Sequence, residues 1–125
     1  MKDYLLKRYK SFKYAFAGLK LFFLEANFKI HLFATAIVMI VSIFCDLSAT
    51  EYLFIISSIF LVIIAESINT IIEKLMDRIT EAYDVKIKAI KDMSAAFVLI
   101  AAVYAIVVAG VIFIPKIQLL LNLGV

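Results

Sequence analysis

The sequence predicts an all-α membrane protein in which an N-terminal amphipathic surface helix precedes three transmembrane helices. Hydrophobic residues make up 66% of the 125 residues, and the mean hydropathy is +1.07, whereas a soluble domain contains roughly 45–50% apolar residues. A chain of this length has room for one membrane domain, residues 1–125, and for no separate soluble catalytic module. Any chemistry must therefore be done by the membrane domain itself.

The first element, residues 1–29, is predicted to be a basic helix that lies in the membrane interface. Apolar side chains recur there at spacings of three to four residues, and most of its lysines fall on other faces. An amphipathic helix of this kind buries its apolar face at the level of the lipid headgroups. The apolar stripe consists of Leu5, Tyr9, Phe12, Phe16, Leu19 and Phe23.

Three apolar segments follow, and each approaches or exceeds the roughly 20 residues that a bilayer requires. The first, residues 30–47, carries no formal charge before its final turn apart from His31. The second is residues 52–76. The third, residues 93–114, contains no charge and stops at Pro115, which is predicted to end its helix.

The basic residues predict the orientation of the chain. Residues 1–29 hold seven Lys and Arg, the segment 74–91 holds five, and Lys116 is the remaining one of thirteen. Basic residues near the ends of spans stay on the cytoplasmic side of a membrane. The N-terminus and the connector 77–92 are therefore expected to be cytoplasmic, and the C-terminus is expected to be outside.

An acidic stripe crosses the second apolar segment. Fourteen uncharged residues lead into Glu66, which is followed by Asn69, Glu73 and Asp77. On one helix these four side chains lie within an arc of about 80°. A charged group in hydrocarbon costs roughly 2.5–3.5 kcal/mol even on lenient insertion scales, so such acids must face a protein interior or a site. We expect them to face helices of other subunits, because a three-helix protomer would leave part of the stripe in lipid.

The stripe is predicted to be graded in depth. If the second helix enters at Tyr52, Glu66 lies about 21 Å along it, within the cytoplasmic half of a core roughly 30 Å thick. Glu73 is then close to the interface, and Asp77 is at or beyond it. This gradient suits a site that joins a lipid-borne group to a water-soluble group bound to a cation.

The composition excludes several kinds of site. The three glycines are isolated, so no glycine-rich phosphate loop can form. One cysteine and one histidine cannot make a structural zinc site. Carboxylates with water favour Mg²⁺, which commonly arrives with nucleotide phosphates. Lys91 supplies a cation for phosphate, and Asp92 is its polar neighbour.

At these residues the chain resembles the small bacterial integral-membrane diacylglycerol kinases and undecaprenol kinases. The run from Glu66 to Asp77 matches E-x-x-N-x-x-x-E-x-x-x-D, and Lys91-Asp92 matches the family's A-K-D with one inserted residue, Ile90. Two upstream stretches, residues 11–18 and 25–32, match as well. The resemblance implies a homotrimer in the bacterial inner membrane, bound to no nucleic acid, that transfers the ATP γ-phosphoryl group to a lipid alcohol.

The resemblance also implies roles for individual residues. Glu66 would be the general base on the lipid hydroxyl, with Asn69 beside it and Arg8 as a second substrate-binding residue. Glu25 and Glu73 would bind the Mg²⁺ that ATP carries. The expected nucleotide site consists of Tyr14, Glu25, Glu73, Asp77, Tyr83, Lys91 and Asp92.

The chain departs from the family pattern at a few positions. Asp84 replaces a histidine that commonly follows Tyr83, and Met93-Ser94-Ala95 replaces Met-Gly-Ser. These differences put a substrate role for a serine here in doubt. Between the two lipids, the stretches 27–32 and 112–116 look more like the undecaprenol kinase branch.

Two other functions compete with a lipid kinase. A proton- or cation-coupled transporter subunit would also contain buried carboxylates, but it would need polar groups in both halves of the bilayer, and the outer halves of these spans are nearly free of them. A noncatalytic scaffold gives no reason for the acids. His31 is interpreted as an interfacial polar contact rather than a ligand, and Cys45 as an ordinary apolar residue.

Overall fold

The computed structural model describes residues 1–80 and 82–123, and these residues form four α-helices. Helix α1 spans Lys2–Phe22 and helix α2 spans Ala26–Phe44. Helix α3 spans Ala49–Ile79, and helix α4 spans Val85–Leu123. Within the described residues there is no β-strand, so the prediction of an all-α protein is confirmed.

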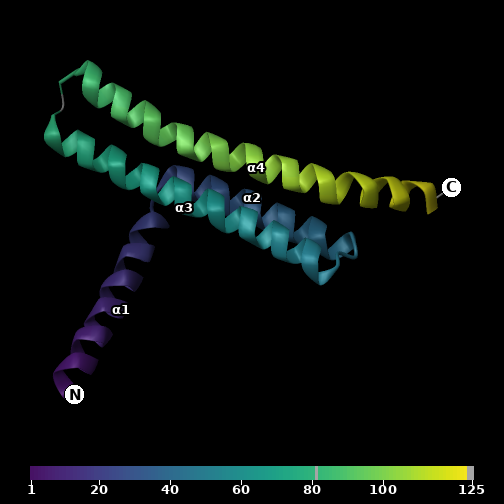
Figure 1. The fold of residues 1–125 in the computed structure, drawn as a ribbon, viewed down its shortest axis with the longest axis horizontal. Helices are drawn as coiled ribbons and strands as arrows, with labels where there is room; N and C mark the ends of the chain where they lie inside the picture. The colour runs from purple at the N-terminus through teal and green to yellow at the C-terminus, as the bar shows by residue number, and fades with distance from the viewer. Residues whose placement is uncertain (81, 124–125) are drawn as a thin grey trace.

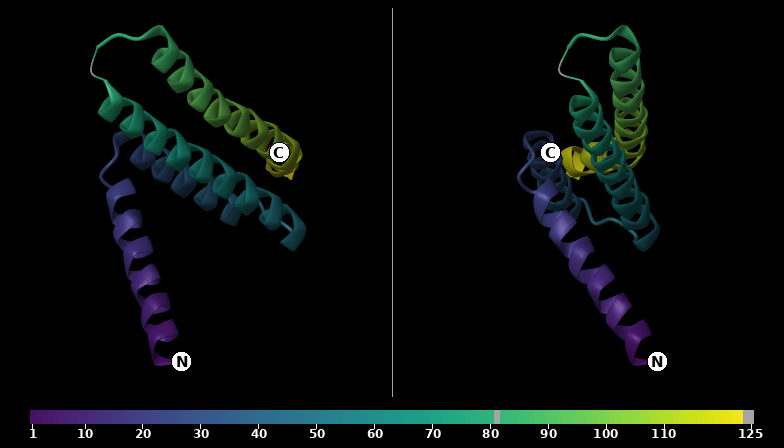
Figure 2. Two further views of the ribbon diagram at one scale, coloured as in Figure 1. Left: turned by 60° about the vertical axis from the view of Figure 1, so that its left-hand side comes forward. Right: turned by 90° about the vertical axis from the view of Figure 1, so that its left-hand side faces the viewer.

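Helices α2, α3 and α4 run side by side, while α1 projects away from them (Figures 1 and 2). Helices α2 and α3 form an antiparallel hairpin, and α4 returns along α3, with which it makes the most extensive contact. We call the end at residues 80–84 the connector end and the end at residues 45–48 the turn end. Helix α1 joins α2 on the side of the connector end (Figure 1).

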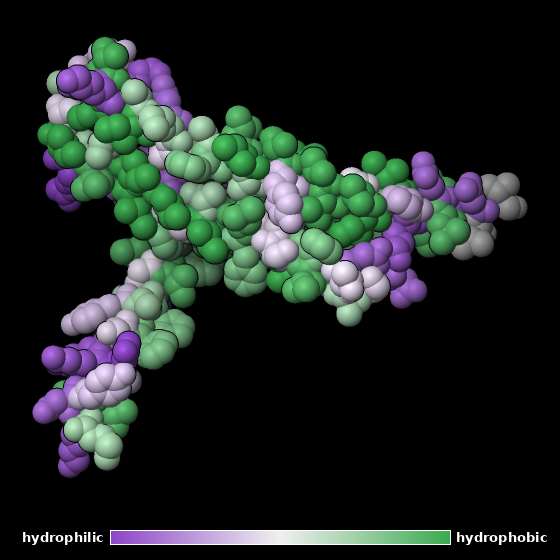
Figure 3. Space-filling model, in the orientation of Figure 1, coloured by the Kyte–Doolittle hydropathy of each residue, from purple (hydrophilic) through white to green (hydrophobic). Residues whose placement is uncertain are grey.

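Three of the helices are long and apolar enough to cross a membrane, as predicted. They are α2, α3 and α4, of which α4 is the most apolar. Figure 3 shows the apolar surface over the middle of these helices, with hydrophilic residues gathered at the connector end, along α1 and near the end of α4. The chain is therefore built as an integral membrane protein.

The helix bounds differ from the predicted ones at both ends of the chain. Helix α1 ends at Phe22, and Glu25 occupies the N-cap position of α2, so residues 1–29 do not form one helix. The prediction that Pro115 ends the last helix is wrong, because α4 continues through it to Leu123. A proline removes one backbone donor and crowds the carbonyl four residues earlier, but membrane helices tolerate it where neighbouring groups or local adjustments satisfy the freed backbone.

The predicted connector 77–92 is mostly helical. Helix α3 continues to Ile79 and α4 begins at Val85, so only residues 80–84 lie between them, and residue 81 is outside the described residues. The Asp84 carboxylate accepts hydrogen bonds from the backbone N–H groups of Lys86, at 2.7 Å, and Ile87, at 3.1 Å. Asp84 therefore caps the N-terminus of α4.

The turn end is closed by a capping box and a lysine. Ser48 and Glu51 exchange side-chain and backbone hydrogen bonds at the start of α3. Lys116 Nζ donates to the Asp46 carbonyl at 3.0 Å and lies 3.4 Å from a Glu51 carboxylate oxygen. Apolar side chains pack beneath this turn: Cys45, Leu47, Ile55, Ile112 and Phe113. The buried position of Cys45 agrees with its interpretation as an apolar residue.

Candidate active site

Glu66 is a buried carboxylate in the middle of the helical bundle. It lies on α3, and only 3% of its surface is exposed. Its Oε1 atom has no hydrogen-bond partner among the described residues. A buried polar atom without a partner is unfavourable by roughly 1–3 kcal/mol, and native proteins rarely keep one without a reason. Oε1 is therefore an acceptor for which the described residues supply no donor.

His31 lies beside the second oxygen of Glu66. Its Nε2 atom on α2 is 3.8 Å from Glu66 Oε2. This position is compatible with the interpretation of His31 as a polar contact. The sequence did not indicate that the group beside it is Glu66, the expected base. The signal in the sequence was weak, because no local pattern links a residue of one span to a residue of another.

Asn69 connects two helices by hydrogen bonds. Its amide nitrogen donates to Glu73 Oε1 at 3.3 Å, and its amide oxygen accepts from the Ser94 hydroxyl of α4 at 2.6 Å. Asn69 and Ser94 are buried, and Glu73 is half-buried. Asn69 was predicted beside the base, which lies one turn earlier on the same helix, but its hydrogen bonds go to Glu73 and Ser94.

The burial of Glu66 corrects the expectation that the acids face other subunits for the deepest acid, whereas Glu73 is half-buried and Asp77 is exposed in a single chain. Glu66 and Asn69 are only 3% and 4% exposed within a single chain. His31 of α2 and Ser94 of α4 lie against this face of α3, so one protomer already encloses it. The stripe becomes exposed only at the connector end, where 65% of the Asp77 side chain is accessible.

Glu25 and Glu73 face one small polar cavity. Its volume is about 270 Å³, and it is also lined by Asn27, Thr70 and Asp77. Lys74 lies at its edge, with Nζ 2.8 Å from a Glu25 carboxylate oxygen. The predicted metal-binding pair is therefore brought together by α3 and the N-terminus of α2.

This donor set fits a magnesium ion that arrives with phosphates. The described residues hold no group of three or more histidine, cysteine or acidic side chains close enough to enclose a metal by themselves. Mg²⁺ keeps several waters and is usually bound by one or two carboxylates together with substrate phosphates. Glu25 and Glu73 supply two carboxylates, and the Lys74 ammonium must yield its contact with Glu25 to the cation.

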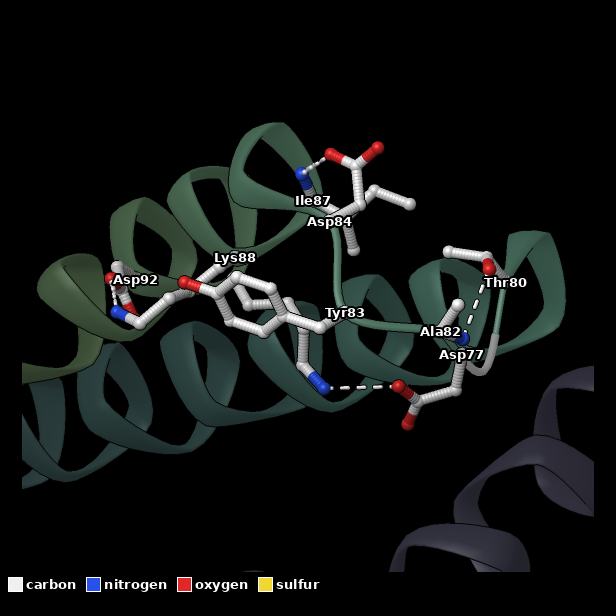
Figure 4. Close-up of a pocket in the computed structure, with 9 residues that line it drawn as sticks. Asp77, Thr80, Ala82, Tyr83, Asp84, Ile87, Lys88 and Asp92 are labelled. Carbon is white, nitrogen blue, oxygen red and sulfur yellow. Dashed lines mark hydrogen bonds and ion pairs between the residues drawn. The ribbon is translucent and has the colours of Figure 1, made fainter.

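A larger cavity lies next to it at the connector end. Its volume is about 650 Å³, and Figure 4 shows its lining from α3, the connector and α4. Four of the predicted nucleotide-binding residues line it: Asp77, Tyr83, Lys91 and Asp92. Asp77 lines both cavities, so the carboxylate pair and this larger space adjoin.

The lysines of this cavity are paired with acids. Lys91 Nζ donates to Asp77 Oδ1 at 2.9 Å, and Lys88 forms an ion pair with Asp92. The hydrogen bond that Lys91 donates to Asp77 raises the pKa of Lys91, which lies before the predicted third span. The Lys91 ammonium is charged at neutral pH, as lysine ordinarily is, which suits a phosphate contact.

Two predicted site residues lie apart from the others. Arg8 and Tyr14 are exposed on α1, which projects away from the bundle (Figure 1). The Arg8 guanidinium stacks on the Tyr4 ring, with 5.2 Å to its centroid, and donates to the Tyr4 hydroxyl. A single chain does not bring these two residues to the cavities.

Comparison with known proteins identifies the family. The sequence profile described as prokaryotic diacylglycerol kinase matches residues 13–113. The chain is 34% identical to a diacylglycerol kinase of Synechocystis over 84% of this chain and 61% of that protein. It is 33% identical to an undecaprenol kinase of Bacillus subtilis over 92% of this chain and 94% of that protein, and 33% identical to a diacylglycerol kinase of Escherichia coli over 78% and 81%.

The chain thus spans less than two thirds of the Synechocystis protein but nearly all of the Bacillus subtilis one. The profile match covers α2, α3 and α4 as far as residue 113, together with the cavities described above. On this evidence the chain belongs to the prokaryotic diacylglycerol kinase family.

Proposed function

We propose that the protein is an ATP-dependent lipid kinase of the bacterial cytoplasmic membrane. It transfers the γ-phosphoryl group of ATP to the hydroxyl of a membrane lipid alcohol. The observation that carries this proposal is the unpartnered, buried Oε1 of Glu66, on the helix that also bears Glu73. Seven residues separate the two acids, or about 10 Å along the helix, a span that allows one ligand to lie in lipid and the other near water.

The proposed chemistry assigns one task to each part of the stripe. Glu66 orients the lipid hydroxyl and accepts its proton, because phosphoryl transfer needs an aligned nucleophile. Glu25 and Glu73 would hold the Mg²⁺ that accompanies ATP, and this ion would offset the charge of the phosphates. His31 Nε2 lies 3.8 Å from the other oxygen of Glu66, beyond hydrogen-bond distance, and leaves Oε1 to the substrate.

The larger cavity is the proposed nucleotide site. Lys91 offers a charged donor to the phosphates, while Asp77, Tyr83 and Asp92 line the space around it. Tyr14 and Arg8 are proposed to complete the sites from the surface helix, Tyr14 near the adenine and Arg8 near the lipid. The position of α1 away from its own bundle supports a homotrimer in which the surface helix lies along the membrane interface.

Undecaprenol is the proposed acceptor in preference to diacylglycerol. The undecaprenol kinase of Bacillus subtilis is matched over 94% of its length, and the diacylglycerol kinases of Escherichia coli and Synechocystis over 81% and 61%. An apolar cavity of about 260 Å³ begins at His31 and continues between α2, α3 and α4, where small side chains such as Ala34, Ala102 and Ala105 leave room. Such a cavity suits part of a long hydrocarbon chain.

An assay that supplies ATP to one face of the membrane at a time distinguishes the proposed lipid kinase from the competing transporter. In sealed vesicles of known orientation, ATP is expected to support lipid phosphorylation only from the face that bears the N-terminus, because the polar cavities open at the connector end. The vesicles are also expected to hold a proton or sodium gradient. The matched control is Glu66→Gln, which should abolish the labelling of lipid.

Two results of this assay would contradict the proposal. A gradient that collapses without ATP consumption, and that stays intact in Glu66→Gln vesicles, would establish a transporter and reject the kinase. Labelling of lipid from both faces would contradict the proposed orientation.

A further inference from the structure

Ser94 makes a buried hydrogen bond to the helix that carries the acids. It lies on α4, is 3% exposed, and places its Oγ atom 2.6 Å from Asn69 Oδ1. Asn69 is 4% exposed and donates in turn to Glu73 Oε1. Ser94, Asn69 and Glu73 therefore form one chain of hydrogen bonds from α4 to the polar cavity that Glu73 lines.

The chemistry of the three groups fixes the direction of this chain. The Glu73 carboxylate can only accept, so Asn69 must present its amide nitrogen to Glu73 and its oxygen to Ser94. Ser94 must then donate its single hydroxyl proton to Asn69. The Lys91 carbonyl, 2.9 Å from the same hydroxyl, is the alternative acceptor for that proton.

Loss of the Ser94 hydroxyl would release one end of the Asn69 amide. Asn69 Oδ1 would be buried without a donor, and the side chain would no longer be anchored to α4. The amide nitrogen would still face the Glu73 carboxylate, but its hydrogen bond, already 3.3 Å long, would hold Glu73 Oε1 less firmly. When all three residues are present, Asn69 holds Glu73 Oε1, and Glu73 Oε2 is left for a cation.

From this geometry we propose that Ser94 is a positioning residue that acts through Asn69 to hold Glu73 ready for Mg²⁺. This inference rests on the proposed function, since it assigns the cation to Glu73. It gives a role to the serine at a position where the family pattern has glycine. These hydrogen bonds also couple α4, which carries Lys91, to the carboxylate pair across the contact between α3 and α4.

A purely structural role is the alternative, because hydroxyl groups often join packed membrane helices. Ser58 offers a matched control. It is also 3% exposed, but its hydroxyl donates at 2.8 Å to the Ile55 carbonyl of its own helix. Ser58→Ala removes an equally buried hydroxyl without touching the chain from Ser94 to Glu73.

The test measures the Mg²⁺ dependence of lipid phosphorylation at saturating ATP in Ser94→Ala, Ser94→Thr and Ser58→Ala. We expect Ser94→Ala to raise the KM for Mg²⁺ about five-fold, the size of one hydrogen bond, with kcat changed less than about two-fold. Ser94→Thr keeps a hydroxyl and should restore the KM, and Ser58→Ala should not change it. An unchanged KM in Ser94→Ala would overturn the proposal.

A double-mutant cycle tests the route of the effect. Asn69→Ala removes the residue that links Ser94 to Glu73. Adding Ser94→Ala to it should therefore have no further effect on the KM for Mg²⁺, because Ser94 acts only through Asn69. Additive effects would mean that Ser94 does not act through Asn69.

A binding measurement keeps this inference separate from the kinase activity. Mn²⁺ with ATP, followed by its electron paramagnetic resonance signal, reports cation affinity without turnover and should weaken about five-fold in Ser94→Ala. If the wild-type protein binds Mn²⁺ and ATP but phosphorylates no lipid, the proposed function fails while the effect of Ser94 is still measured. Equal Mn²⁺ affinity in the wild type and Ser94→Ala would refute the role of Ser94 alone.

Discussion

Glu66→Gln is expected to lower the turnover of lipid phosphorylation by about 10² to 10⁴, the usual contribution of a positioned base. The amide keeps the shape of the side chain but cannot accept the proton of the lipid hydroxyl. The residue lies deep in the bundle, away from the two cavities at the connector end. The KM for ATP should therefore stay unchanged, and the measurement is the initial rate of purified protein in mixed micelles.

Glu51→Gln is the matched control for this substitution. It changes an acid to its amide on the same helix, at the turn end, and glutamine can still serve in the capping box with Ser48. Its activity should equal that of the wild type. A Glu66→Gln protein with more than a tenth of the wild-type turnover would remove Glu66 from the role of base.

Glu73→Gln is expected to raise the KM values for Mg²⁺ and ATP together, each by about ten-fold or more, and to lower the rate. A contact with a charged group is worth roughly 1.5–3 kcal/mol, and this substitution removes one of the two carboxylates proposed to bind the metal in the cavity. The effect should exceed that of Ser94→Ala, which disturbs the position of Glu73 but leaves its charge. Titration of Mg²⁺ at fixed ATP, and of ATP at fixed Mg²⁺, measures both values.

The lipid dependence separates a metal ligand from a lipid contact. If Glu73→Gln changes the KM for the lipid alone, Glu73 does not belong to the cation site. In that case the pairing of Glu25 with Lys74 would be a structural ion pair, and Glu25→Gln should leave the Mg²⁺ requirement as it is in the wild type.

The apolar helices could be predicted from the sequence because hydropathy is a local property that persists over a whole span. Helix ends were less predictable. Pro115 is a helix breaker in water, yet α4 continues through it within an apolar stretch. Asp84 was seen only as a departure from the family pattern, and its role as the N-cap of α4 became visible with its two backbone hydrogen bonds.

The acidic stripe could also be predicted, because helical periodicity alone places Glu66, Asn69 and Glu73 on one face. The partners of these residues could not. His31 and Ser94 come from α2 and α4, and no period within one helix determines which residue of another helix lies opposite. This limit also explains why the stripe was expected to need other subunits, although a single chain buries its deeper half.

Transfer of label from [γ-³²P]ATP to lipid by the purified protein tests the proposed function most directly. Undecaprenol and diacylglycerol are offered in separate mixed micelles with Mg²⁺, and the lipid products are extracted and counted. We expect a phosphorylated lipid whose formation requires Glu66, with undecaprenol the better acceptor. Release of inorganic phosphate without any labelled lipid, or labelling that persists at the wild-type rate in Glu66→Gln, would contradict a lipid kinase that uses the acids of α3.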